Sequence, residues 1–407
     1  MSTILTHIWD SYNDEGKELL LSDIKALAAY DKLILMFPEF KFFIDNEIVM
    51  MLNSVRQVDN PPYHLDDETD RIGYKQHDTI SYSTFYGYKT KFAYLKEADK
   101  GNLKNKNEAL SQNLALAIPC GSFSYANIEP NRIIGLSGTL EVMCEHEKSI
   151  LKKYGINQHL FIPSVYGETN ASFDKAGNGI SIEKGLGNYF HKITKEIKNV
   201  TSKKNRAVIV FFCNQERLNE YKADPLYRKL GQKKEILTEE KSANEKAYMI
   251  SKAATAGQIT LCTSIFGRGT DFFCSNETLE ENGGVHVIQT FLSADTSEEI
   301  QIKGRTARQG KRGSYELVLL DKDLKDNFGI ELGSSDDWPE VEVYKNLCDA
   351  RGKGFQKKKF DEMEKNIILA NEKHQATHKY FDALLDSDTL RAMKLLKDMY
   401  VNVGSSA

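Results

Sequence analysis

Residues 258–272 read QITLCTSIFGRGTDF. The segment opens with an apolar run, Ile259–Cys262, that has the length and composition of a buried strand. It then places two glycines, Gly267 and Gly269, around Arg268, and such glycines allow a sharp turn that brings backbone N–H groups close to a ligand. In parallel α/β sheets, ligands bind at the carboxyl ends of the strands, where the loops gather. A buried strand that ends in this kind of turn is therefore typical of an α/β fold.

The surrounding region, residues 164–335, repeats the same rhythm of short apolar runs and helical segments. The apolar runs are RAVIVFFCN (206–214), KKEILT (233–238), QITLCTS (258–264), GGVHVIQTF (283–291) and SYELVLL (314–320). Segments with helical spacing, such as NEKAYMISKAATAG (244–257) and SEEIQIKGRTARQG (297–310), stand between several of them. This alternation predicts a parallel sheet with helices on both faces.

The flanking regions read differently. In residues 1–163, SDIKALAAYDKLILMF (22–37) has helical spacing, whereas TISYSTFYGYKTKFAYL (79–95) alternates and suggests strands or a hairpin. Residues 336–407 carry no strand pattern, and from Phe360 onward apolar positions recur at helical spacing, which predicts a long amphipathic helix. We therefore expect three parts: a mixed region over 1–163, an α/β domain over 164–335 and a helical region over 336–407.

Composition narrows the functional classes. The 407 residues are 41% hydrophobic and 28% charged with a net charge of −4, so nothing global indicates a nucleic-acid or membrane-surface protein. The six cysteines are scattered without a C-x-x-C pair, which favours reduced thiols in a cytosol-like compartment over disulfides or a zinc site. The sequence shows neither a secretory signal nor a run of eighteen apolar residues. We expect a soluble cytoplasmic chain without a transmembrane segment.

The arginines indicate the chemistry. In QIKGRTARQG (301–310), Arg305 and Arg308 stand three residues apart, on one face of a helix or at its end. Together with Arg268 they would be costly to gather in one cleft without an anion. Arginine suits phosphate, because its planar guanidinium donates two parallel hydrogen bonds.

At these residues the chain resembles the SecA preprotein translocase ATPases, within the superfamily two helicase-like motors. The family's fifth motif, GRGTDI, is matched by Gly267, Arg268, Gly269, Thr270, Asp271 and Phe272. Its sixth motif, Q-x-x-G-R-S-G-R-Q-G, is matched from Gln301 to Gly310, and its G-G-L-H-V-I segment from Gly283 to Ile288. The third motif, a T-G-T turn, is similar to Ser137, Gly138 and Thr139, and residues 336–365 resemble the start of the scaffold helix. The ordered match, from about residue 130 to about residue 380, looks closer to divergent eukaryotic SecA-domain proteins than to bacterial translocases.

The resemblance implies a two-lobed RecA-like motor that uses ATP and Mg²⁺. It implies that Arg308 is an arginine finger supported by Arg305 and Arg268, and that Gln301 positions the finger or the attacking water. The Gly267–Asp271 turn would contact the nucleotide. Ser137, Gly138 and Thr139 would couple phosphate release to lobe movement, and the C-terminal helices would carry that movement to an unfolded polypeptide.

Two parts of a working motor have no match in these residues: the phosphate-cradling G-x-x-x-x-G-K-[ST] and a carboxylate that holds magnesium. The GYKT at Gly87 lacks the leading glycine of a phosphate loop. As a magnesium carboxylate, Asp361 follows lysines rather than an apolar strand. Asp45 in FFIDNE resembles such a carboxylate more closely, because apolar residues precede it. The chain is therefore expected to be the later part of a motor. It would hydrolyse ATP only with a preceding lobe supplied in cis or in trans.

Other interpretations stay open. The glycine turn could be structural and Arg305 and Arg308 could be solvated helix charges, which would make the chain an inactive interaction module. The basic stretch from Arg351 to Lys359 could serve a nucleic-acid translocase, although the acidic residues that follow favour a mixed-sign helix face. His286 is expected to be a hydrogen-bonded strand residue. No third ligand accompanies His374 and His378, so no metal is expected. The aromatic residues from Tyr82 to Tyr94 are expected in a core or on a sheet surface, or else in substrate contact.

Overall fold

The computed structural model describes residues 1–66, 68–76, 79–115, 120–127, 131–173, 179–231, 233–272, 277–330, 342–351 and 356–404. The chain divides into two compact units, one formed by Met1–Glu129 with Lys365–Ala407 and the other by Pro130–Glu364. The three-part functional division stays a prediction, and its boundary at residues 335 and 336 lies outside the described residues.

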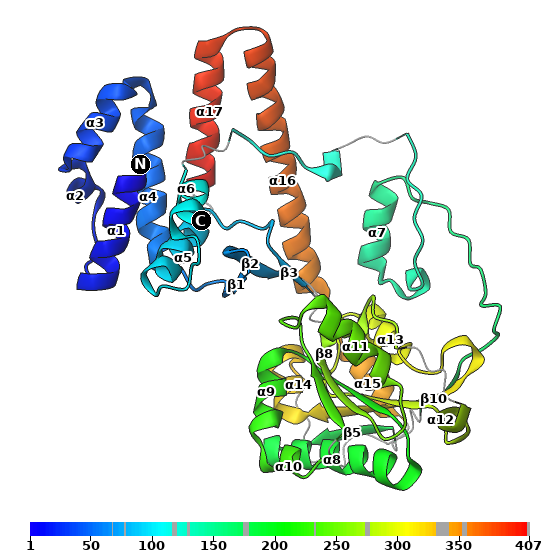
Figure 1. Cartoon of the computed structure of the whole chain (residues 1–407). Helices are drawn as coiled ribbons and strands as arrows, with labels where there is room; N and C mark the ends of the chain where they lie inside the picture. Colours follow the sequence, from blue (N-terminus) through cyan, green and yellow to red (C-terminus); the bar gives the residue numbers. More distant parts are fainter. Residues whose placement is uncertain are drawn as a thin grey trace. The chain divides into compact units, whose positions relative to one another are not determined.

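The second unit is built on a seven-stranded sheet (Figure 1). Its strands are β4 (Asn170–Ser172), β5 (Ile180–Glu183), β6 (Val208–Phe212), β7 (Lys234–Leu237), β8 (Ile259–Thr263), β9 (Val285–Gln289) and β10 (Arg312–Leu320). They lie in the order β4-β10-β9-β6-β8-β7, with β5 also pairing with β10, and every pairing is parallel. Each of the five apolar runs noted in the sequence forms a strand, so the predicted α/β fold is confirmed.

Helices cover this sheet on both faces, as the runs of buried residues require. The helices around the sheet are α8 (Leu186–Lys198), α9 (Gln215–Ala223), α10 (Pro225–Arg228), α11 (Ala243–Ala253), α12 (Glu277–Glu281), α13 (Thr296–Lys303), α14 (Asp321–Phe328) and α15 (Val343–Ala350). Helix α7 (Glu145–Lys153) belongs to the same unit and lies apart from the sheet (Figure 1). Short helical turns are η3 (Leu140–Val142), the π-helix η4 (Asn199–Lys203), η5 (Ser264–Gly267) and η6 (Arg308–Gly310).

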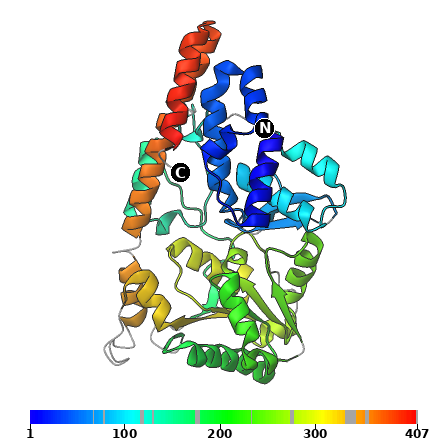
Figure 2. The same ribbon diagram turned by 90° about the vertical axis from the view of Figure 1, so that its left-hand side faces the viewer.

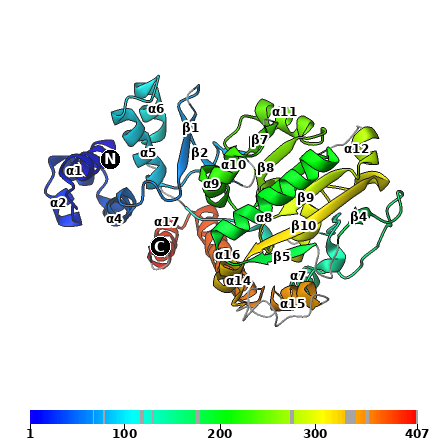
Figure 3. The same ribbon diagram turned by 90° about the horizontal axis from the view of Figure 1, so that it is seen from below.

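The two faces of β6 show how the layers form. Side chains alternate along a strand, so Ile209 and Phe211 join one core, and Val208, Val210 and Phe212 join the other. The first core is completed by buried residues of α11, α13, α14 and α15, and the second by residues of α8 and α9. Figure 2 shows α14 and α15 in gold and orange and α8 in green, and Figure 3 shows α8 lying across the strands. This is the parallel sheet with helices on both faces that the sequence predicted.

The first unit is mainly helical. It contains α1 (Ser2–Glu15), α2 (Leu21–Lys25), α3 (Ala28–Met36), η1 (Pro38–Phe40), α4 (Lys41–Val55), α5 (Tyr88–Asp99), α6 (Lys106–Asn113), η2 (Tyr125–Asn127) and a small antiparallel sheet of β1 (Tyr63–Asp66), β2 (Arg71–Gln76) and β3 (Thr79–Ser81). The helix α16 (Gln356–Leu385) enters this unit at Lys365, and α17 (Thr389–Gly404) follows it. Buried Phe43 of α4 packs with Tyr380, Ala383, Ala392 and Leu396 of these last two helices.

One local prediction was wrong. Of the alternating stretch 79–95, only Thr79–Ser81 is a strand, and residues from Tyr88 onward form α5. Burial explains the helix, because Tyr88, Phe92 and Leu95 enter the core at helical spacing. The predicted long helix from Phe360 is confirmed as part of α16, and the helical pattern of 22–37 is divided between α2 and α3.

The weaker candidate sites have structural explanations. Asp45 lies within α4 rather than after a strand, and its carboxylate accepts from Lys25 Nζ at 2.8 Å and Tyr30 OH at 2.7 Å. His374 Nδ1 accepts from the Ser124 N–H at 3.0 Å. Across the described part of the chain, no group of three or more His, Cys, Asp or Glu residues could hold a metal ion. Within the same residues, no helix has the length and apolar character needed to cross a membrane.

Candidate functional site

The glycine turn leaves the carboxyl end of β8 and immediately packs on helix α13. A Cβ atom built on Gly267 would lie 2.4 Å from Ile302 Cγ1, so only glycine fits this contact. Gly269 has a φ of 69°, in the left-handed region that glycine adopts without strain. The two glycines of the motif are therefore explained by close packing and backbone conformation in the loop.

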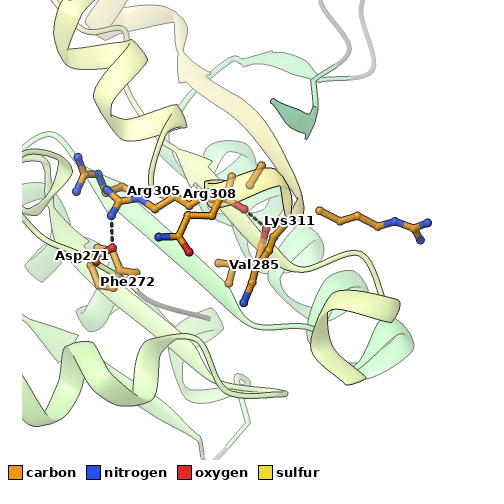
Figure 4. Close-up of a pocket in the computed structure, with 10 residues that line it drawn as sticks. Asp271, Phe272, Val285, Arg305, Arg308 and Lys311 are labelled. Atoms are coloured by element: carbon orange, nitrogen blue, oxygen red, sulfur yellow. Dashed lines mark hydrogen bonds and ion pairs between the residues drawn. The ribbon is translucent and has the colours of Figure 1, made fainter. Parts of the chain in front are cut away.

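The arginines follow α13 directly. After Lys303 the chain turns through Ala307 and Gln309, which have φ values of 53° and 54° although neither is glycine. Left-handed backbone costs a residue with a Cβ atom roughly 1–2 kcal/mol, and such strain is often found at functional sites. The turn places Arg305 and Arg308 beside the loop that follows β8 (Figure 4).

Arg305 joins the two motifs through backbone oxygens. Its Nε donates to the Gln301 carbonyl at 3.0 Å, and its Nη1 donates to the Thr270 carbonyl. The side chain is buried, and this burial, with a smaller contribution from nearby Arg308, lowers the pKa of Arg305 to about 10. Asp271 acts in the opposite direction. Arg305 thus fixes the loop to the end of α13.

Arg308 makes a different kind of contact. Its Nε donates to the Gly304 carbonyl at 2.8 Å, while its Nη1 pairs with Asp271 Oδ1 (Figure 4). The two side chains of this ion pair are 35% and 64% exposed. An exposed pair of this kind is held weakly, because water screens both charges. An incoming anion could therefore replace Asp271 as the partner of Arg308 at little cost.

The arginines line a small pocket. Its lining residues are Asp271, Phe272, Val285, Arg305, Thr306, Ala307, Arg308, Gln309, Lys311 and Arg312, and its volume is about 50 Å³. Pockets for small organic ligands usually measure roughly 300–1,000 Å³. The pocket is therefore much smaller than a cavity that encloses a small organic ligand.

The loop after β8 leads to a pocket that lies near the first residues of β9 and β10. The loop begins at the carboxyl end of β8, as predicted, and continues along the face of the sheet that carries α11, α13, α14 and α15, where buried Phe272 packs near Phe211. The pocket is bordered by Val285 and Arg312, the first residues of β9 and β10. Asp271 and Arg308 consequently lie near the amino ends of these two strands.

The remaining predicted residues lie in several places. Arg268 is exposed, and its Nη2 donates to Ser297 Oγ of α13 at 3.3 Å. Gln301 is half-buried on α13. Ser137 and Gly138 are exposed and Thr139 is half-buried, in a turn where the Thr139 N–H donates to Ser137 Oγ at 3.2 Å. None of these five residues is among those that line the arginine pocket. The proposed role of every candidate residue remains a prediction.

Sequence reasoning missed part of the site and misjudged one arginine. Lys311 and Arg312 add two cations to the pocket, a signal already present in the basic residues that follow the motif. Arg351 was expected on a solvated helix face with its neighbouring lysines, but it is buried and pairs with Glu299 of α13. The side chains of Lys357–Lys359, and Lys353, lie outside the described residues. His286 lies on β9 as expected and shares a 2.7 Å hydrogen bond with Ser314.

No family model matches the chain. Protein translocase subunit SecA 2 of Rhodopirellula baltica is 41% identical over 102 residues, which make up 25% of this chain and 15% of that protein. SecA of Caldicellulosiruptor saccharolyticus is 30% identical over 216 residues (50% of this chain, 25% of that protein). SecA of Clostridium botulinum is 27% identical over 291 residues (68% and 33%).

Two helicase-type structures are also similar to the chain. The DEAD-box helicase Mss116 bound to ssRNA and UDP-BeF has a TM-score of 0.33 at 17% identity, over 64% of this chain and 50% of that one. The C-terminal part of the Fun30 ATPase domain has a TM-score of 0.29 at 18% identity, over 44% and 54%. Scores this low support no argument by themselves.

The SecA relatives are much longer than the matched region. The chain spans between 12% and 33% of their length. Their similarity agrees with the glycine turn, the arginine motif and the parallel sheet described above. The chain is a homologue of the SecA protein translocases over parts of its length.

Proposed function

We propose that the chain supplies the arginine-bearing half of an ATP site in a SecA-like motor. The observation that carries this proposal is the exposed Arg308–Asp271 pair, held beside buried Arg305 in a pocket too small to enclose a nucleotide. A facing lobe would bring the phosphate loop and the ligands of Mg²⁺. ATP, once bound between the lobes, supplies the phosphoryl group that is transferred to water.

Each predicted residue has a role in this proposal. Arg308 exchanges Asp271 for phosphate oxygens and stabilises negative charge that develops during transfer. Arg305 holds the loop of Gly267–Asp271 in place and Arg268 supports the positive wall. Gln301 positions the finger or the attacking water, and Ser137–Thr139 couples the site to lobe movement.

We further propose that the motor moves unfolded polypeptide in the cytoplasm. The SecA relatives are named protein translocases, and the chain is slightly acidic, with a net charge of −4. A nucleic-acid motor would be expected to show a basic stripe, since each neutralised phosphate adds affinity through counterion release. A reducing compartment agrees with the six cysteines, because they are scattered in the sequence without a C-x-x-C pair, as is typical of reduced thiols.

The proposal is tested by adding a purified SecA-type first lobe to the chain and measuring ATP hydrolysis. The chain alone should not hydrolyse ATP, whereas the mixture should, with stimulation by an unfolded polypeptide. Arg308→Ala should lower turnover about a thousandfold or more, or roughly 4 kcal/mol of transition-state stabilisation, because arginine fingers act mainly on the transition state. ATP affinity should change much less.

An exposed arginine of α10, Arg228, gives the matched control, and Arg228→Ala should leave turnover unchanged. Equal losses of binding and turnover in Arg308→Ala would make Arg308 an ordinary binding residue. Hydrolysis by the chain alone would refute the half-site. Stimulation by single-stranded nucleic acid with a steep salt dependence would indicate a helicase-type motor, and no hydrolysis by the mixture would favour an inactive interaction module.

A further inference from the structure

Helix α13 supports both halves of the candidate site. The loop after β8 rests on it through the contact between Gly267 and Ile302, and through the hydrogen bond from Arg268 to Ser297. Arg305 and Arg308 follow its last residue and donate to carbonyls at its C-terminal end. Any displacement of α13 would therefore move the loop and the arginines together.

The same helix is held by a buried ionic network, which we call the Glu299 network and which consists of Glu299, Lys303, Tyr344 and Arg351. Glu299 Oε1 accepts from Lys303 Nζ at 2.5 Å and from Tyr344 OH at 2.6 Å, and Glu299 Oε2 accepts from Arg351 Nη2. The side chains of Glu299 and Arg351 are both 1% exposed. The network thereby joins α13 to α15 and to Arg351, the residue that follows α15.

The Glu299 network contains two cations, Lys303 and Arg351, but only one carboxylate. Burial alone would raise the pKa of Glu299, but Arg351 and Lys303 outweigh it and hold that pKa below its ordinary value. One carboxylate cannot neutralise both cations. Lys303 Nζ lies 4.4 Å from the ring centre of Phe173, 4.6 Å from that of Tyr344 and 5.0 Å from that of Tyr315. These aromatic faces stabilise the second positive charge.

A buried ion pair of this kind fixes orientation more than it adds stability, because removing two charges from water offsets most of their attraction. Arg351 also donates through Nη1 to Thr296 Oγ1 at 3.2 Å, so it contacts the first residue of α13 as well as Glu299. We propose that Glu299 and Arg351 are positioning residues, which set the position of α13 and hence of Arg305 and Arg308 relative to α15. Only what those arginines bind rests on the proposed function.

The position of Arg351 between α15 and α16 lets the Glu299 network link movement of α15 to α13. Arg351 follows α15 and precedes the first residue of α16, Gln356, by five residues. A change that pulls on α15 or on the segment after it acts first on Arg351, then on Glu299 and α13, and finally on the arginine turn. The arginines would be presented to a facing lobe only while the network is intact.

The test is hydrogen exchange of the chain itself, without nucleotide. Arg351→Met removes the charge and keeps much of the side-chain volume. It should raise exchange of the amides in residues 304–311 roughly tenfold or more, because exchange from structured amides follows the free energy of local opening. Amides of β6 and β8 should be unaffected, and Arg351→Lys should restore part of the protection.

Arg217→Met is the matched control. Arg217 also forms a partly buried ion pair in this unit, with Asp323 at 2.8 Å, but it joins α9 to α14 and leaves α13 untouched. This control should leave residues 304–311 unchanged. If Arg351→Met does not fold, Tyr344→Phe deletes a single donor to Glu299 and should give the same pattern with a smaller amplitude. A uniform increase over β6 and β8, or no increase over residues 304–311, would overturn the proposal.

The outcome is separable from that of the proposed function. With the first lobe added, Arg351→Met should lower the turnover number more than it weakens ATP binding. If the exchange pattern is found but the mixture hydrolyses no ATP, then the motor proposal fails and the positioning role stands. If hydrolysis is found without the exchange pattern, the reverse holds.

Discussion

Two ion pairs adjoin α13, one formed by Glu299 within the helix and one by Arg308 after its end, and they differ in exposure and in how firmly they are held. Arg308 and Asp271 are 35% and 64% exposed, whereas Arg351 and Glu299 are both 1% exposed. Water already screens the first pair, so breaking it leaves two hydrated charges. Breaking the second leaves an uncompensated charge in the interior. The same residue type thus serves as a replaceable contact at one position and as a fixed structural element at the other.

The largest expected effect comes from breaking the buried pair. Glu299→Ala should lower the free energy of unfolding by roughly 3–5 kcal/mol, because it removes the carboxylate shared by Arg351 and Lys303. Urea unfolding of the second unit's signal would measure it. The exposed Glu240 is the control, and Glu240→Ala should stay within about 0.5 kcal/mol. A loss below about 1 kcal/mol would place the Glu299 pair in the same class as the exposed one.

A smaller loss is expected where the loop meets α13. In Gly267→Ala the new methyl group would lie 2.4 Å from Ile302 Cγ1, so the loop or the helix must shift. Overpacking of this kind costs roughly 1–3 kcal/mol, and thermal unfolding would detect it. Gly187 of α8 has open space around it, so Gly187→Ala should be neutral or slightly stabilising. Equal behaviour of the two variants would show that α13 does not support the loop closely.

The smallest effect should follow from the exposed pair. Asp271→Asn removes its negative charge and should change the free energy of unfolding by about 0–1 kcal/mol. Denaturation in urea at low and at high salt would test this, and the difference should shrink further as salt increases. A destabilisation comparable to that of Glu299→Ala would mean that Asp271 is structural, and that an anion could not displace it cheaply.

The sequence predicted the fold well because the second unit obeys local rules. Its strands are short apolar runs buried on both faces, and these read the same in the sequence and in the sheet. The arginine motif and the glycine turn could be placed together in advance. In the structure, Arg305 donates to the Thr270 carbonyl and Arg308 pairs with Asp271, so the two motifs do lie together.

The sequence did not predict the burial of residues whose partners lie far away in the chain. Arg351 lies near several lysines and reads as a solvated charge, but its burial requires Glu299, which lies 52 residues earlier in the chain. Alternation in residues 79–95 favoured strands, yet Tyr88 and Phe92 form a helix because they pack into the core of the first unit. No local pattern distinguishes these cases, since the deciding partner lies elsewhere in the sequence.

The first unit contains contacts between residues that are synthesised far apart in time. Buried Glu47 accepts from Tyr88 OH through one oxygen and from Tyr400 OH at 3.1 Å through the other, and Tyr400 is made 353 residues later. During synthesis the α/β unit emerges complete while Glu47 still awaits its second donor. The contacts of Glu47 and Phe43 with α17 are therefore the last contacts of the first unit to form, and a chain that stopped before α17 would lack them.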